Sequence, residues 1–169
     1  FTNPSDLPKF IDPCYMGKDI GVISDAGCPG IADPGAEIVR LAHQNSIQVI
    51  PMVGPSSILL GLMSSGLNGQ KFAFQGYLPI EKQERKKLLK QLEKQSQQIN
   101  QTQIFIETPY RNNQMLDALI KTLAKNTRLC VACNLGEADE FIQTKAINIW
   151  EIERPDLHKK PCIFLFLRD

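Results

Sequence analysis

Residues 20–57 restrict the possible folds of this chain more than any other stretch. An apolar run over residues 20–24 leads into a loop, residues 24–35, with the sequence Ser-Asp-Ala-Gly-Cys-Pro-Gly-Ile-Ala-Asp-Pro-Gly. A helical pattern follows over residues 36–44, and a second apolar run over residues 47–53 ends in Gly-Pro-Ser-Ser. Short apolar runs of this kind are typical of strands buried on both faces of a parallel sheet. The stretch therefore predicts a β-α-β unit of an α/β fold.

The loop over residues 24–35 suits close contact with a small ligand. Ligands of open α/β sheets bind at the carboxyl ends of the strands. The three glycines of the loop let a backbone approach a ligand, and Asp25 and Asp33 offer hydrogen-bond acceptors. The loop has neither G-x-G-x-x-G nor Gly-Lys-Ser/Thr, and its carboxylates would repel a pyrophosphate, so a nucleoside with a neutral or cationic tail fits better. The alternative interpretation is that both aspartates only cap turns.

The pattern restarts at Phe72, after a linker over residues 67–71. Helices are predicted over residues 5–16, 36–44, 58–64, 81–97 and 112–124, and strands of the second half over residues 72–77, 103–107, 128–134, 141–146 and 161–167. The last strands have no helical crossovers, so part of their pairing must be antiparallel. The predicted fold class is α/β with two domains, a parallel sheet in residues 1–68 and a mixed sheet in residues 69–169.

Four motifs occur in a fixed order along the chain. They are the loop motif Asp25–Gly35, Gly54–Ser57, Phe74–Pro79 and Glu107–Arg111. Together they resemble the S-adenosylmethionine-dependent tetrapyrrole methylase superfamily. The most similar branch is that of ribosomal RNA small-subunit methyltransferase I, which methylates a ribose 2′-hydroxyl. The resemblance covers the chain from about Gly21 to the C-terminus and implies the two-domain fold of that superfamily.

The start of the chain differs from the start of the proteins it resembles. Members of the superfamily begin with an earlier strand, a Pro-rich glycine loop and a Glu-Asp-Thr-Arg-like motif, and this sequence begins at Phe1 without them. We therefore expect the chain to correspond to a C-terminal part that lacks roughly one β-α-β unit.

The resemblance implies S-adenosyl-L-methionine as the cofactor, held between the two domains, and a homodimer. The cofactor contacts that it implies in the first domain are Asp25, Ala26, Gly27, Ala32, Asp33, Pro34, Ser56 and Ser57. Those that it implies in the second domain are Thr108, Asn134 and Pro161. Methyl transfer from a sulfonium is an in-line displacement that depends on holding the nucleophile against the methyl carbon, so no metal is expected.

The segment Glu107–Arg111 places a carboxylate and a guanidinium where an apolar strand gives way to a helix. One interpretation is an internal ion pair, with Pro109 in the first helical turn. We favour the other interpretation, in which Glu107 and Arg111 are catalytic residues that serve the methyl acceptor. In that role the pair would be exposed and would contribute only about 0–1 kcal/mol to stability. The planar fork of arginine can hold a phosphate or a carboxylate.

One segment of the sequence differs from the ribosomal RNA branch, and for this reason the sequence does not determine which molecule accepts the methyl group. Residues 132–136 read Ala-Cys-Asn-Leu-Gly, where the ribosomal RNA branch has an Ala-Arg-Glu-Leu-Thr-like segment. We favour methylation of a ribose 2′-hydroxyl of small-subunit ribosomal RNA. The alternatives are C-methylation of a tetrapyrrole of the precorrin or uroporphyrinogen type, and a paralogue that binds S-adenosylmethionine without catalysis.

Charge is nearly balanced, with a net charge of +1. Phosphate contacts normally show as an excess of basic residues, so this balance argues against a binder driven by charge alone. One helix concentrates basic residues, namely Lys82, Arg85, Lys86, Lys87, Lys90 and Lys94. Because glutamates interleave with them at helical spacing, we favour a solvated face with intrahelical ion pairs over a contact with RNA.

The five cysteines and two histidines do not predict a metal site. Cys130 and Cys133 have the spacing of metal ligands, but there is no second pair and a strand points them to opposite faces, so we predict two core cysteines. His43 and His158 are predicted at the surface. An odd number of cysteines in apolar patterns, no signal-peptide pattern and no apolar run of membrane-spanning length together predict a cytoplasmic location.

Overall fold

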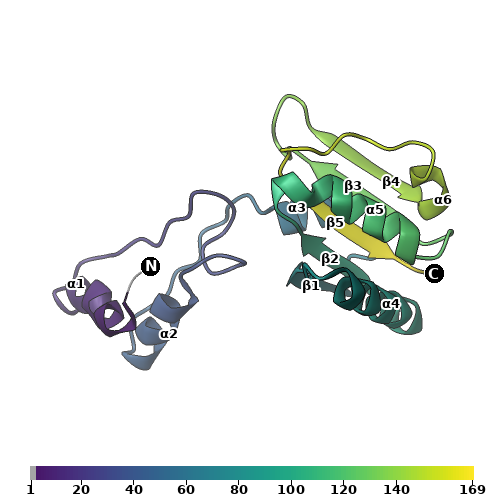
Figure 1. Ribbon diagram of the computed structural model, residues 1–169. Coiled ribbons are helices and arrows are strands. Elements are labelled where there is room, and N and C mark those ends of the chain that lie inside the picture. The colour runs from purple at the N-terminus through teal and green to yellow at the C-terminus, as the bar shows by residue number, and fades with distance from the viewer. Residues whose placement is uncertain (1–2) are drawn as a thin grey trace. The chain divides into compact units, whose positions relative to one another are not determined.

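The computed structural model describes residues 3–169 and divides the chain into two compact units (Figure 1). The first unit ends at Ser56, and the second is Ser57–Asp169. The division precedes the predicted linker at residues 67–71. Helix α3 (Ser57–Ser65) therefore belongs with the second unit, on whose sheet it packs.

The first unit contains η1 (Pro4–Ile11), α1 (Asp12–Tyr15) and α2 (Ala36–Gln44). The predicted helix over residues 36–44 is confirmed at both ends. The predicted helix over residues 5–16 forms instead as a 3-10 helix followed by one α-helical turn. Prolines inside it explain the difference, because a proline has no N–H to continue an α-helical ladder.

The predicted parallel sheet of the first unit is wrong for the described residues. Residues 20–24 and 47–53 form no strand there. Their apolar side chains are largely uncovered, with Ile23 90% and Met52 86% exposed. Parallel strands occur where main-chain partners flank them and other layers cover both faces, and these two segments have neither in the structure. An apolar run alone did not identify a strand here.

The second unit is built on a five-stranded mixed sheet, as predicted. Its strands are β1 (Phe72–Tyr77), β2 (Thr102–Ile106), β3 (Arg128–Cys133), β4 (Phe141–Ala146) and β5 (Cys162–Leu167), in the spatial order β1-β2-β5-β3-β4. Strands β1 and β2 pair in parallel, and β5 pairs antiparallel with both β2 and β3. Strand β4 is antiparallel to β3. Every predicted strand of this half is therefore present.

The helices of the second unit have identifiable boundaries. Helix α4 (Lys82–Ile99) begins where the Glu81 carboxylate accepts a hydrogen bond from the Glu84 N–H at 2.7 Å, and bonds from such main-chain donors lower the pKa of Glu81. It ends at Asn100, whose backbone is left-handed. The remaining elements are η2 (Pro109–Arg111), α5 (Asn112–Thr122) and α6 (Ile147–Trp150). Helix α6 was not predicted, because four residues are too few to show a helical period.

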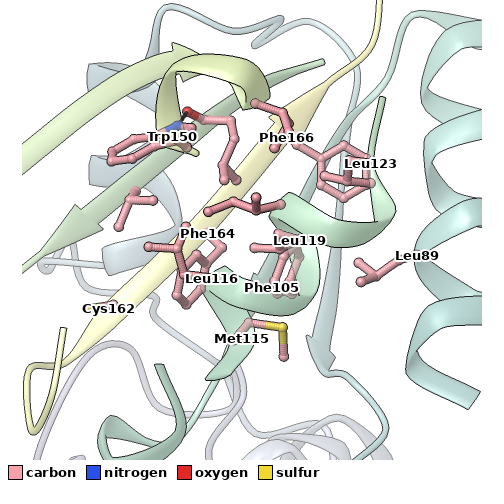
Figure 2. Close-up of a cluster of buried hydrophobic side chains, with 14 of the residues drawn as sticks. Leu89, Phe105, Met115, Leu116, Leu119, Leu123, Trp150, Cys162, Phe164 and Phe166 are labelled. Carbon is pink, nitrogen blue, oxygen red and sulfur yellow. Dashed lines mark hydrogen bonds between the residues drawn. The ribbon is translucent and has the colours of Figure 1, made fainter. Parts of the chain in front are cut away.

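The two faces of the sheet carry two hydrophobic clusters. Helices α4 and α5 cover one face, where Phe105 and Phe164 stack with ring centroids 5.6 Å apart (Figure 2). Helix α3 packs on the other face, against Ile163 and Leu165. Strand β5 lies in the middle of the sheet and is buried on both faces, which explains its uninterrupted apolar sequence.

Helix α3 approaches the sheet through Gly61. A Cβ at this position would lie 2.9 Å from Cγ2 of Ile163 and 3.4 Å from Cδ1 of Leu165. The Ile163 methyl is attached to a branched Cβ and has little freedom to move. The absence of a side chain at Gly61 therefore sets the distance between α3 and β5.

We expect Gly61→Leu to lower the free energy of unfolding by about 1–3 kcal/mol, because overpacking would push α3 off the sheet. Urea denaturation followed by circular dichroism measures the effect. The matched control is Gly69→Leu, since no atom lies within 4 Å of the Cβ position at Gly69. Equal stability of the two variants would contradict this account of the α3 contact.

The cysteines of the sheet lie on its two faces, as predicted. Cys130 belongs to the cluster under α3, and burial raises the pKa of its thiol. Cys133 belongs to the opposite cluster and forms a disulfide with Cys162, which faces it across β3 and β5. The sequence pattern did not predict this pair. No helix among residues 3–169 combines the length and the hydrophobicity needed to cross a bilayer.

Candidate functional site

The loop of the first unit folds back on itself through main-chain hydrogen bonds. The Gly30 N–H donates to the Pro34 carbonyl at 3.0 Å, and the Ile31 N–H donates to the Cys28 carbonyl at 3.1 Å. Ala32, which lies within the turn that the Gly30–Pro34 hydrogen bond closes, has a left-handed backbone with φ 55°. The sequence Cys-Pro-Gly-Ile-Ala-Asp-Pro-Gly thus forms a closed double turn rather than an open strand end.

Gly35 is the glycine of this loop with the closest surroundings. Its φ is +129°, and a Cβ would lie 3.2 Å from Cγ1 of Val22 and 3.4 Å from the nitrogen of Gly30. Helix α2 begins immediately after it, with the Val39 N–H donating to the Gly35 carbonyl at 3.2 Å. The glycine therefore joins the double turn to the helix in one step.

Neither Asp25 nor Asp33 caps a turn. Among the described residues, no donor bonds to either carboxylate and no cation pairs with one. The local cap is Ser24, whose Oγ accepts from the Ala26 N–H at 3.3 Å and donates to the Ala26 carbonyl at 2.8 Å. Asp25 is exposed and Asp33 is half-buried. The turn-cap alternative is therefore not supported, and both carboxylates have acceptor capacity left for a ligand.

A second segment of the first unit lies against this loop. The Cys28 thiol donates to the carbonyls of Pro55 and Gly54, at 3.6 and 3.9 Å. Ser56, which follows, is buried. The structure thus brings Cys28 of the loop close to the Gly-Pro-Ser segment. The sequence had not singled out Cys28 for this contact.

In the second unit, three predicted residues gather at one edge of the sheet. Thr108 follows β2, Asn134 follows β3 and Pro161 precedes β5. Because β5 runs antiparallel to β2 and β3, its start lies at their carboxyl ends. The Asn134 N–H donates to the Pro161 carbonyl at 3.0 Å, and Asn134 has a left-handed backbone with φ 51°.

Asn112 supports this edge and was not predicted from sequence. It is fully buried, and its Nδ2 donates to the carbonyl of Lys160 at 2.6 Å. Its Oδ1 is buried without a hydrogen-bond partner among the described residues. An asparagine at the start of a predicted helix is common, so its sequence position alone carried no signal.

The predicted catalytic pair has a different environment from the one expected. The Glu107 side chain is 1% exposed, and its Oε1 accepts from Arg111 Nη2 at 2.6 Å, from Arg111 Nε at 3.1 Å and from the Thr108 N–H at 2.7 Å. The expectation of an exposed pair is therefore wrong. Glu107 continues the alternation of β2 and takes the side of Phe105, which α5 covers. The Arg111 side chain is 29% exposed.

The comparisons with known proteins agree with the resemblance seen in the motifs. No protein-family model matches the chain. A protein of Buchnera aphidicola subsp. Schizaphis graminum named "Ribosomal RNA small subunit methyltransferase I" is 33% identical over 160 residues, which are 93% of this chain and 55% of that protein. A Bacillus subtilis protein of the same name is 40% identical over 136 residues, 80% of this chain and 45% of that protein.

A solved structure shares the fold. The crystal structure of the methyltransferase CobJ has a TM-score of 0.62 and 13% sequence identity, and the match covers 99% of this chain and 73% of that one. The chain spans about half the length of the relatives that it matches in sequence, which fits the expected correspondence to a part of such proteins.

Proposed function

We propose that the chain belongs to the tetrapyrrole methylase superfamily, with ribosomal RNA small subunit methyltransferase I proteins among its relatives, and that it serves S-adenosylmethionine-dependent methyl transfer to a ribose 2′-hydroxyl of small-subunit ribosomal RNA. The observation that carries the proposal is the 33% identity to a protein of that name over 93% of the chain. The matched region includes the loop whose two carboxylates, Asp25 and Asp33, have no partner among the described residues.

The first unit has the chemistry that the cofactor needs. S-adenosylmethionine carries ribose hydroxyls, an ammonium group and a sulfonium, and Asp25 and Asp33 are acceptors that suit such donors and cations. No atom lies within 4 Å of the Cβ position at Gly27, so a ligand can reach the backbone there. The proposal also assigns Ala26, Ala32, Pro34 and Ser56 of this unit to cofactor contacts. From the second unit it assigns Ser57, Thr108, Asn134 and Pro161.

We assign Arg111 to binding the RNA that accepts the methyl group. Its Nη2 and Nε donate to Glu107, whereas no described residue accepts a hydrogen bond from its Nη1. The guanidinium can therefore contact a backbone phosphate of the RNA while Glu107 holds it in place. Glu107 is buried and does not reach a substrate itself, so we assign it to positioning Arg111. The bound cofactor supplies the methyl group.

A transfer assay with tritiated S-adenosylmethionine tests the proposed function. The complete protein should label the small ribosomal subunit or its RNA, and alkaline hydrolysis should leave the label at a ribose. Labelling of a porphyrinogen instead would replace the proposed acceptor with a tetrapyrrole. Cofactor binding without transfer to either acceptor would point to the paralogue without catalysis. The likeness to CobJ does not favour a tetrapyrrole, because 13% identity shows the fold alone.

We expect Asp25→Ala to weaken S-adenosylmethionine binding by about 1.5–3 kcal/mol, the loss of a hydrogen bond to a charged group. This corresponds to about a tenfold to hundredfold rise in Kd, which isothermal titration calorimetry measures. The matched control is Asp19→Ala, which removes an exposed carboxylate of the same unit outside the loop. If Asp25→Ala binds as tightly as Asp19→Ala, the cofactor does not use this loop carboxylate.

A further inference from the structure

A groove lies between helices α4 and α5 of the second unit, with a volume of about 530 Å³. Such a volume is within the range of about 300–1,000 Å³ that is typical of ligand sites. Its lining residues are Lys82, Arg85, Lys86, Gln114, Asp117, Ala118, Lys121 and Thr122. Four of these eight side chains are cationic and one is anionic. The anionic one, Asp117, pairs with Arg154 at 2.7 Å, which reduces its effect on the groove.

Arg85 gives the groove a fixed positive charge. The residue is only 8% exposed, although its long side chain carries a full charge. Its Nη1 donates to the main-chain carbonyls of Ile80 and Pro79, at 3.2 and 3.5 Å. Its Nε has no partner, and no carboxylate lies within ion-pair distance of it among the described residues. The main-chain carbonyls compensate this buried cation only in part, as does the carboxylate of Glu81, whose pKa is lowered by main-chain hydrogen bonds and also by the Arg85 charge, without an ion pair between the two. A buried cation that is incompletely compensated is costly, so an anionic ligand suits this position.

The lysines of the groove are free of the intrahelical pairs that the sequence predicted. In the described part of the chain, no carboxylate pairs with Lys82, Lys86 or Lys121. Two of the interleaved glutamates are engaged elsewhere. Glu81 caps α4, and Glu93 points inward and accepts hydrogen bonds from the Ala124 N–H and the Thr127 hydroxyl. Among residues 3–169, the solvated ion-pair network that would explain the basic helix is therefore not formed.

We propose that this groove binds backbone phosphates of the RNA substrate, an inference that rests on the proposed function. The buried guanidinium of Arg85 would give a directed contact at the base of the groove. The three lysines would add point charges at its rim, as is usual for phosphate contacts that position an RNA without reading its sequence. The nearly neutral net charge of the chain does not oppose this, because the positive charge is concentrated in one place.

Two triple variants with equal changes in charge test the assignment. The groove variant is Lys82→Gln/Lys86→Gln/Lys121→Gln, and the control is Lys87→Gln/Lys90→Gln/Lys94→Gln, whose lysines are exposed on α4 outside the groove. Fluorescence anisotropy of a labelled small-subunit ribosomal RNA stem-loop is measured with the complete protein between 50 and 200 mM KCl. Thermal melting and calorimetry with S-adenosylmethionine establish that both variants fold and bind the cofactor.

The groove variant should bind the stem-loop at least about tenfold more weakly, and the slope of log affinity against log salt should fall by about 2–3, because three phosphate contacts are lost. The control variant should bind nearly as the unchanged protein does. Equal losses in both variants, or no loss in the groove variant, would overturn the assignment. Competition by polyglutamate as strong as that by RNA would also overturn it, in favour of an acidic protein partner.

The outcome can be separated from that of the proposed function. RNA binding that depends on the groove, without any methyl transfer, would support the assignment of the groove and contradict the proposed methyltransferase function. Methyl transfer that is equal in the two triple variants at limiting RNA would support the methyltransferase function and contradict the assignment of the groove.

Discussion

Arg111→Ala should lower the free energy of unfolding by about 3 kcal/mol, the low end of the cost of removing one partner from a buried ion pair. The variant removes two of the three hydrogen bonds that the described residues donate to the Glu107 carboxylate and leaves only the Thr108 N–H. Because the Glu107 side chain is 1% exposed, water does not readily replace the lost donors. Urea denaturation at neutral pH measures the change.

A double-mutant cycle identifies the cause of the loss. Glu107→Gln removes the charge that Arg111 compensates, so Arg111→Ala should cost much less in that background. Arg111→Lys keeps the charge but loses the fork that donates through two nitrogens, and we expect it to fall between the unchanged protein and Arg111→Ala. A loss below about 1 kcal/mol, the range of surface pairs, would show that the pair is effectively solvated.

Turnover per folded molecule separates the two roles of Arg111. The proposed contact with the acceptor requires turnover to fall in Arg111→Ala even at a temperature where the variant is fully folded. The effect should appear in the KM for RNA and leave the affinity for S-adenosylmethionine unchanged. Normal turnover per folded molecule would make Arg111 a residue of the fold alone.

The second unit was predictable because its local patterns agree with its tertiary structure. Strands β1 and β4 have the predicted bounds, and α4 and α5 differ from prediction by one or two residues at their ends. Strand β5 could be recognised because a central strand is buried on both faces and reads as a continuous apolar run. The mixed pairing followed from the missing crossovers. In this unit, the hydrophobic period and the length of each segment were sufficient to predict nearly all of the helices and strands.

In the first unit, the same kind of sequence pattern did not predict the strands correctly. Residues 20–24 and 47–53 are largely apolar, yet they form no strand in the structure. A helix closes its hydrogen bonds within one segment, whereas a strand needs a neighbour that its own sequence does not specify. Helix α2 was therefore predicted to the residue, and the strands on either side of it were not.

The resemblance had implied Thr108, Asn134 and Pro161 as cofactor contacts, and the structure places all three at the same end of the sheet. Their contact with a cofactor stays a prediction. The burial of Glu107 was not predicted, because the end of a strand was expected to be exposed, whereas the alternation of β2 continues for one residue beyond the strand. The Cys133–Cys162 disulfide was missed because register across β3 and β5 is a tertiary property.

Trp150→Ala should have the largest effect on stability, lowering the free energy of unfolding by about 3–5 kcal/mol. Trp150 ends α6 and is fully buried in the cluster between the sheet, α5 and α6 (Figure 2). Its Nε1 donates to the Leu129 carbonyl at 2.9 Å, and the Lys145 ammonium lies 5.0 Å from its ring centroid. Alanine would leave a cavity and remove both contacts, as equilibrium denaturation in urea should show.

Two control variants divide this loss into its parts. Trp150→Phe keeps most of the buried aromatic volume and removes the Nε1 donor, so we expect about 1–3 kcal/mol, the cost of an unsatisfied buried acceptor and a smaller void. Ile149→Ala changes the neighbouring residue of α6, which is 37% exposed, and should cost less than either Trp150 variant. Because α6 is a single turn, its own hydrogen bonds cannot hold it in place, and its position depends on tertiary contacts. These are the buried side chains of Ile147 and Trp150 and the main-chain hydrogen bonds that α6 donates to Lys125 and Thr127. If Trp150→Ala were no more destabilising than Ile149→Ala, α6 would be held by its flanking strand β4 and not by this side chain.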